Sequence, residues 1–137
     1  MKKLLIIPML FASYMGMAQV ADSASIIGKS IRIDNLLVAQ NDFPTRMNWD
    51  DATAACAALG PGWRLPTQDE LILIFQNKDN IGGFVADYYY WSSTEYNATY
   101  AFGFAFYQDL DALLQQQGES TGYLKTNTAT VRGVRAF

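Results

Sequence analysis

The chain has 137 residues, with 10 Lys and Arg against 13 Asp and Glu, and therefore a formal net charge of -3. This length allows one domain, and so weak and acidic a charge excludes nucleic acid or an anionic membrane surface as the main partner, since both require a concentrated basic patch. The lack of histidine removes the commonest general base and the commonest transition-metal ligand.

The amino terminus has the pattern of a secretory signal peptide. Lys2 and Lys3 precede an apolar stretch that ends in small residues, with cleavage expected after Ala18. An uncleaved membrane anchor is the alternative, but Pro8 interrupts the stretch, which is short for a span of about 20 residues. We expect residues 1–18 to be a signal peptide and residues 19–137 to be a single exported domain without a membrane span, located in the periplasm, at the cell surface or outside the cell.

The first half of this domain predicts short strands and then two helices. Residues 25–39 carry β-branched residues in partial alternation, which indicates one or two strands. Asn48 is expected to cap a helix that ends at residues 60–61, with one face formed by Trp49, Ala52, Cys56 and Leu59. Cys56, the single cysteine, is interpreted as a buried apolar residue of that face.

The second helix has the clearest local signal. Thr67 and Glu70 form a capping box, and the inner face is predicted to hold Leu71, Ile74 and Phe75. The helix should end in a polar segment before a glycine turn at residues 81–83. Arg64 lies just before the cap, and we interpret it as a structural arginine bonded to carbonyls or to a carboxylate, rather than as an anion clamp.

After Phe84 the apolar period changes to two, which predicts strands over residues 87–94, 100–107 and 128–137. Residues 108–122 fit a helix, a long loop or a hairpin arm equally well, and their conformation stays open. The pattern predicts an α+β domain in which two helices are followed by an antiparallel sheet.

Residues 88–107 are rich in aromatic side chains, and strand alternation predicts how they divide. Phenylalanines at every second position belong in the core against the helices, together with Trp91, whose indole N–H requires a partner. The residues between them should face the other way. The phenylalanines are Phe102, Phe104 and Phe106, and their alternating neighbours are Ala101, Gly103, Ala105 and Tyr107.

Polar and aromatic residues within and after this stretch predict a ligand-binding surface. Tyrosine with Asn and Asp is typical of adaptable binding surfaces, because a rigid ring offers contact area at low entropic cost and keeps a hydroxyl for specificity. The alternative is that these are ordinary solvent-facing side chains at a sheet edge. The candidate ligand-binding residues are Tyr96, Asn97, Tyr107, Gln108, Asp109, Asp111, Tyr123, Lys125 and Asn127.

A catalytic or metal site is not expected, and neither is a cofactor. Ser92 and Ser93 have no histidine to activate them, and Cys56 lies in an apolar helix without a basic neighbour in sequence. Asp109 and Asp111 could face one way, but nothing near them in sequence supplies the further oxygen ligands that calcium requires.

The ordered motifs WDDATAACAALGPGWRLPTQDEL, NKDNIGGF, YYYWSSTEYN and VRGVRAF resemble the Lcl C-terminal domain family, a bacterial domain of unknown function named after a collagen-like adhesin. The resemblance implies a C-type-lectin-like fold with two helices packed on a small twisted antiparallel sheet. Some members resemble the variable proteins of diversity-generating retroelements, and the segment from WSSTEYN to VRAF, residues 91–137, looks like that variable region. Many relatives pair a helix cysteine with one in the final strand, where this chain has Gly133.

We therefore expect an exported, non-enzymatic recognition domain that presents a variable-type surface to a protein or glycan ligand at a cell or phage surface. A structural or adhesive cell-surface module without a discrete pocket is the alternative. A cryptic hydrolase is the third hypothesis.

Overall fold

The computed structural model describes residues 22–86, 88–106 and 119–137. This part of the chain contains four helices and seven strands. In chain order they are α2 (Ser23–Ile27), β1 (Ile31–Ile33), β2 (Leu36–Val38), α3 (Trp49–Ala57), β3 (Trp63–Arg64), α4 (Gln68–Gln76), α5 (Lys78–Ile81), β4 (Tyr89–Glu95), β5 (Tyr100–Ala105), β6 (Glu119–Leu124) and β7 (Val134–Ala136).

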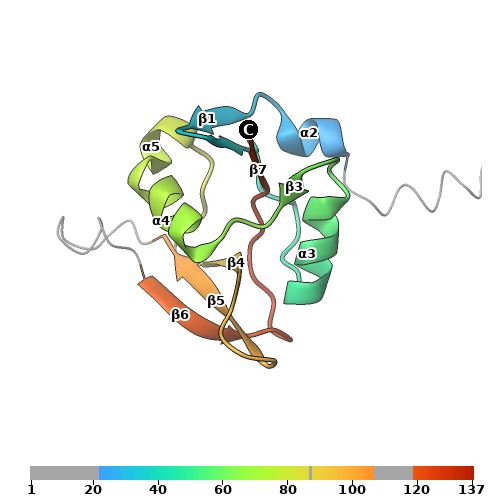
Figure 1. Ribbon diagram of the computed structural model, residues 1–137, viewed down its shortest axis with the longest axis vertical. Coiled ribbons are helices and arrows are strands. Elements are labelled where there is room, and N and C mark those ends of the chain that lie inside the picture. Colours follow the sequence, from blue (N-terminus) through green and yellow to red (C-terminus); the bar gives the residue numbers. More distant parts are fainter. Residues whose placement is uncertain (1–21, 87, 107–118) are drawn as a thin grey trace, which may run out of the picture.

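The strands form two antiparallel sheets. One has the order β1-β2-β7-β3, so that the last strand of the chain lies between strands from its first half. The other has the order β4-β5-β6. The two sheets lie at opposite ends of the molecule, with α3 on one side and α4 on the other (Figure 1). This confirms two main helices with antiparallel strands, although the strands are divided between two sheets.

Both main helices begin where their capping residues predict. The Asn48 side chain accepts a hydrogen bond from the backbone N–H of Asp51 at 2.9 Å and caps α3. Thr67 and Glu70 form the complete capping box of α4. The short helices α2 and α5 were not anticipated, because each is only about one turn long and leaves little periodicity in the sequence.

Arg64 is a structural arginine, as predicted. Its guanidinium donates to both carboxylate oxygens of Glu70, at 2.6 and 2.9 Å, and to the carbonyl of Leu65. Burial alone would raise the pKa of Glu70, but hydrogen bonds from Arg64 and Thr67 and the charge of Arg64 lower that pKa below its ordinary value. Arg64 thus ties β3 to the first turn of α4.

The buried side chains form two clusters, one for each main helix. The first places Ala52 and Cys56 of α3 against Trp91 and Val131. In the second, Phe75 of α4 packs on Phe104 and Phe106, with ring centroids 5.5 and 5.2 Å apart. The prediction that the phenylalanines pack against a helix is confirmed for these two, whereas Phe102 is only half buried.

The expectation that the small-residue face of β5 turns to solvent is wrong. Ala101 and Ala105 are fully buried, because larger rings from both neighbouring strands cover them. The Tyr123 ring lies 4.9 Å from that of Tyr89 and 5.4 Å from that of Trp91. Trp91 is buried as predicted, and its indole N–H donates to the Met47 carbonyl at 2.8 Å. The small-residue face of β5 is therefore core from Ala101 to Ala105, and the phenylalanine face is core at Phe104.

The predicted final strand is also shorter than expected. Of residues 128–137, only Val134–Ala136 form a strand, and Ala129 and Thr130 make isolated bridges to Met47 and Tyr90. Between these bridges and β7, the buried Arg132 side chain forms an ion pair with Asp42 at 2.6 Å. This segment passes between the two sheets and therefore cannot form a ladder along its whole length.

Candidate functional site

The turn between β4 and β5 is held by its own backbone. The carbonyl of Tyr100 accepts hydrogen bonds from the backbone N–H groups of Tyr96 and Asn97, at 2.9 and 3.1 Å. The side-chain oxygen of Asn97 accepts from the N–H groups of Thr99 and Tyr100, both at 2.8 Å. Asn is suited to this position because its side chain replaces a missing backbone acceptor.

The end of β6 is fixed to this turn. The backbone N–H of Lys125 donates to the carbonyl of Thr99 at 3.0 Å, and the N–H of Asn127 closes a turn on the carbonyl of Leu124 at 2.9 Å. The Trp49 backbone N–H, at the start of α3, donates to the Lys125 carbonyl. Three segments far apart in the sequence therefore meet at one end of the three-stranded sheet.

The Lys125 side chain strengthens this junction. The side chain is mostly covered, and its ammonium group lies 2.6 Å from the Glu95 carboxylate and 4.4 Å from the centre of the Trp49 ring. The Trp49 indole N–H in turn donates to the carbonyl of Ser92 at 2.9 Å. Lys125 is thus bonded within the protein, so its first role is to hold the end of β6.

Large side chains are exposed on this frame. Tyr96 is 66% exposed, Tyr100 37% and Leu124 36%. Tyr100 and Leu124 are direct cross-strand partners and so share a face, and Tyr96 meets the edge of Phe102 on that face at 5.7 Å. We call the set Tyr96, Asn97, Tyr100, Leu124 and Asn127 the hairpin surface.

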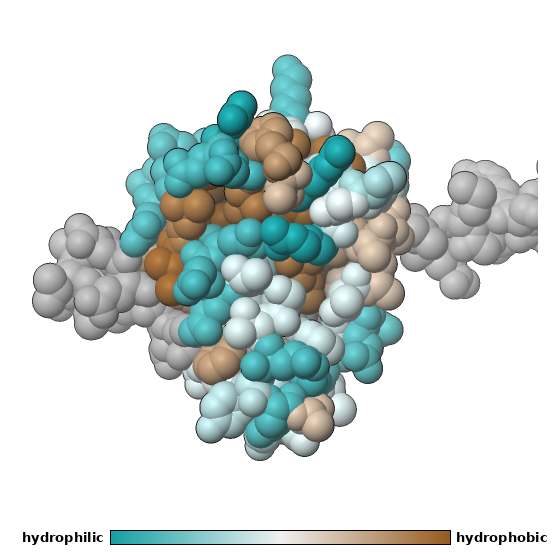
Figure 2. Space-filling model, viewed as in Figure 1, coloured by the Kyte–Doolittle hydropathy of each residue, from teal (hydrophilic) through white to brown (hydrophobic). Residues whose placement is uncertain are grey.

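Figure 2 shows how this end of the molecule differs from the other. Hydrophobic side chains gather in the upper half of the visible face, where Figure 1 places β1 and α4. The lower half, which holds the three-stranded sheet, is mainly pale or hydrophilic. The tyrosine and asparagine side chains at this end are amphipathic or polar. Such side chains suit a surface that is exposed to water in the free protein and is covered by a ligand in a complex.

The structure brings some of the predicted ligand-binding residues together and separates others. Tyr96, Asn97, Lys125 and Asn127 lie at the junction described above. Tyr123 lies on the opposite face of the sheet, half buried against Tyr89 and Trp91. The remaining predicted residues, Tyr107, Gln108, Asp109 and Asp111, lie outside the described residues.

Sequence reasoning missed Tyr100 and Leu124 as surface residues. Tyr100 has the same strand parity as the phenylalanines, and that parity assigned the face to the core. The same face is covered by Phe75 of α4 at Phe104 but is open at Tyr100. The exposure of Tyr100 depends on how far α4 extends along β5. Strand alternation does not contain that information.

The candidate nucleophiles are part of the scaffold. Ser92 is buried, and its hydroxyl donates to the carbonyl of Phe102 at 2.7 Å. Burial raises the pKa of the Cys56 thiol to about 12, so that thiolate is scarce at neutral pH. Within residues 22–86, 88–106 and 119–137 there is no group of three or more Cys, Asp or Glu side chains that could hold a metal ion.

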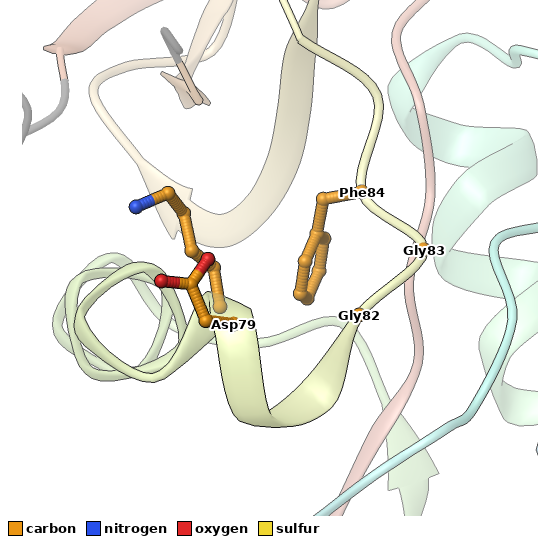
Figure 3. A pocket seen from close by; sticks show the side chains of 5 residues that line it. Asp79, Gly82, Gly83 and Phe84 are labelled. Carbon is orange, nitrogen blue, oxygen red and sulfur yellow. The ribbon is translucent and has the colours of Figure 1, made fainter.

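A shallow hollow of about 260 Å³ lies between α5 and the glycine turn that follows it. Figure 3 shows the ring of Phe84 on one side of this hollow and the carboxylate of Asp79 on the other. The carbonyls of Gly82 and Gly83 accept hydrogen bonds from the buried Arg132, and that guanidinium stacks on Phe84 at 4.2 Å. The two carbonyls and the Phe84 ring are therefore already engaged by Arg132.

Solved structures share this arrangement of helices and sheets. EMS16, an antagonist of the collagen receptor integrin α2β1, matches 79% of this chain and 97% of its own with a TM-score of 0.55 at 12% identity. Rhodocetin matches 79% of this chain and 97% of its own with a TM-score of 0.54 at 11% identity. Both are snake-venom C-type-lectin-like proteins. The fold is C-type-lectin-like.

At these identities the likeness establishes the fold alone. No protein-family model matches the sequence, and no curated protein matches it. Across the described residues, no helix is long and apolar enough to cross a membrane. Within this fold, the hairpin surface lies at the β4–β5 turn and the end of β6. Its Tyr100 and Leu124 side chains are on the opposite face of the three-stranded sheet from Tyr123.

Proposed function

We propose that the protein is an exported, non-enzymatic recognition domain that binds a protein or glycan ligand through the hairpin surface. The observation that carries this proposal is the exposure of Tyr96, Tyr100 and Leu124 at the β4–β5 turn and the adjoining end of β6, which backbone hydrogen bonds and the Asn97 side chain hold in place. Large apolar groups held outward on a rigid frame lose little entropy when a ligand covers them.

The chemistry of this surface fits either ligand class. Tyrosine rings can stack on the apolar face of a sugar or fill a protein groove, and their hydroxyls add directional hydrogen bonds. The exposed Asn97 and Asn127 keep side-chain N–H donors available beside the rings, because the hydrogen bonds of Asn97 described above use only its oxygen.

The comparisons support a binding role in general terms. EMS16 has this fold and is described as an antagonist of an integrin, which is a protein receptor. The resemblance to variable proteins of diversity-generating retroelements adds the idea that the carboxyl-terminal surface varies between copies. A near-copy of the 3′ end of the gene beside a reverse transcriptase gene would support diversification, and a genomic neighbourhood with neither would oppose it.

A non-enzymatic role is supported by the state of the possible nucleophiles. Cys56 is buried with a raised pKa, and Ser92 donates its hydroxyl proton to a backbone carbonyl. Neither side chain is placed to attack a substrate at the surface.

The proposal is tested by probing an array of glycans and purified cell-surface proteins with the labelled full chain. We expect saturable capture on a small number of spots and loss of that capture in the Tyr96→Ala/Tyr100→Ala double variant. Phe137→Ala is the matched control, because the Phe137 ring is 62% exposed, close to the value for Tyr96, but follows β7 in the other sheet.

Two outcomes oppose the proposal. One is capture that is equal in the double variant and the wild type. The other is the absence of any capture, together with concentration-dependent self-association in sedimentation, which would favour the adhesive or structural module instead.

A further inference from the structure

A second hollow lies at the other end of β4 from the hairpin surface, about 20 Å away along the strand. Its volume is about 240 Å³, and its apolar walls are formed by Phe43, Pro44, Val85 and Tyr88. Val85 is 41% exposed and Tyr88 44%. Pockets for cofactors and drug-sized ligands usually exceed roughly 300 Å³, so this hollow is of a size to take one side chain.

Of the charged side chains that line the hollow, one is already paired and one has no ionic partner among the described residues. The Asp42 carboxylate, which also lines it, accepts from Arg132 through one oxygen and from the Tyr90 hydroxyl through the other. Arg46 lines the hollow too, and among the described residues no carboxylate forms an ion pair with it. Among the described residues that line the hollow, Arg46 is therefore the charged group left without an ionic partner.

The position of Arg46 suits it to bind an anion. Its guanidinium lies 4.3 Å from the centre of the Tyr88 ring. Stacking uses the flat face of the guanidinium and leaves its N–H donors free at the edge, where a carboxylate can accept two hydrogen bonds. Stacking also restricts the side chain before binding, which lowers the entropic cost of that contact.

The hollow also has a buried hydroxyl group that could bind a polar group of a ligand. Thr130 lines the hollow and is more than nine-tenths buried. Its backbone groups bond to Tyr89 and Trp91, but its hydroxyl has no hydrogen-bond partner in the described part of the chain. A buried hydroxyl without a partner destabilises the free protein, and a polar group of a ligand that reaches it relieves that cost.

We infer that this hollow binds an acidic peptide segment of a partner protein. In this complex, one apolar side chain of the segment enters between Phe43 and Val85, an adjacent Asp or Glu pairs with Arg46, and a backbone group of the segment bonds to the Thr130 hydroxyl. The site is separate from the hairpin surface and does not depend on the ligand proposed for it.

The test is a titration of the ¹⁵N-labelled full chain with the peptide acetyl-Gly-Leu-Glu-Gly-amide, followed by amide chemical shifts. We expect saturable shifts at Val85, Tyr88 and Thr130, and about tenfold weaker binding of the matched peptide with Gln in place of Glu. Arg46→Gln should remove the difference between the two peptides.

Arg32→Gln is the matched control, because Arg32 is also exposed and stacked on a ring, that of Phe137 at 4.1 Å, in the other sheet. It should leave the response to both peptides unchanged. Thr130→Val should weaken binding of both peptides without loss of thermal stability. The inference is overturned if the Glu peptide produces no saturable shift at these amides, or if wild type binds both peptides equally.

Discussion

The guanidinium of Arg132 donates to the carboxylate of Asp42 at 2.6 Å, which joins residues 90 positions apart. The Arg132 side chain is fully buried and also donates to the carbonyls of Ala39, Gly82 and Gly83. One side chain from the carboxyl-terminal segment therefore fixes both the loop after β2 and the glycine turn after α5.

Arg132→Met should lower the free energy of unfolding by about 3–5 kcal/mol, because it leaves a buried carboxylate and several carbonyls without a donor. Urea unfolding measures this change. Arg135→Met is the control, since Arg135 is exposed in β7, and it should stay within about 0.5 kcal/mol of wild type. Equal effects of the two variants would show that the buried network contributes no more than a surface charge.

The Arg64 and Glu70 pair predicts a pH dependence. Hydrogen bonds and the charge of Arg64 lower the pKa of Glu70 below its ordinary value despite partial burial. A carboxylate with a lowered folded-state pKa stabilises the protein above its unfolded pKa, about 4.3, and loses that contribution as pH falls through the folded value. Glu70→Gln should therefore be less stable than wild type at pH 7, and the two should converge below about pH 4.

Urea unfolding of both proteins between pH 3 and pH 7 checks this prediction. Gln can still occupy the capping box, so the variant removes the charge and keeps the helix cap. A stability difference that does not change with pH would contradict the assigned role of the ion pair.

Tyr123 and Tyr96 should behave differently when changed to alanine. Tyr123 packs on Tyr89 and Trp91, so Tyr123→Ala should cost about 2 kcal/mol of unfolding free energy. Tyr96 is mostly exposed, and Tyr96→Ala should cost less than about 1 kcal/mol. Thermal and urea unfolding of both variants test this order, and a reversed order would show that the face assignment is wrong.

Position 133 should accept a disulfide to the lone cysteine. A Cβ atom built on Gly133 lies 3.8 Å from the Sγ atom of Cys56, so a sulfur atom at position 133 can reach the Cys56 sulfur after a small approach of the two residues. The same Cβ lies 2.8 Å from Cδ1 of Leu59, so that side chain must shift. Gly133→Cys should form the bond on oxidation and be more stable oxidised than reduced by about 2–4 kcal/mol.

Thiol titration in denaturant and unfolding with and without reductant measure this outcome. Gly133→Ala creates the same crowding at Leu59 without the bond and should be less stable than wild type. Two titratable thiols after oxidation would contradict the close approach of Gly133 to Cys56.

The parts of the fold that local rules govern could be predicted from sequence. Asn48, Thr67 and Glu70 specify helix starts through hydrogen bonds to residues three positions away, and both helices begin there. The structural role of Arg64 was predicted, but the sequence left its partner open among backbone carbonyls, Glu70 and Glu95, and the structure shows Glu70. The short strand β7 could not be predicted, because its length depends on where the segment leaves one sheet and approaches the other.

The candidate site was predicted only in part for a similar reason. Asn97 and Asn127 carry turn propensity in their own side chains and are found in turns. The position of Tyr123 depends on rings of β4, and the exposure of Tyr100 depends on where α4 stops covering β5. Alternation identifies which residues share a face, but only the packing of other elements decides whether that face is buried.

The central claim is that the hairpin surface binds the ligand. It is tested most directly by the Kd of the Tyr96→Ala/Tyr100→Ala variant for the array glycan or protein that wild type binds most tightly. We predict binding at least about tenfold weaker than wild type, as expected when two exposed rings are removed from a contact, with little change in unfolding free energy. An unchanged Kd would contradict the claim.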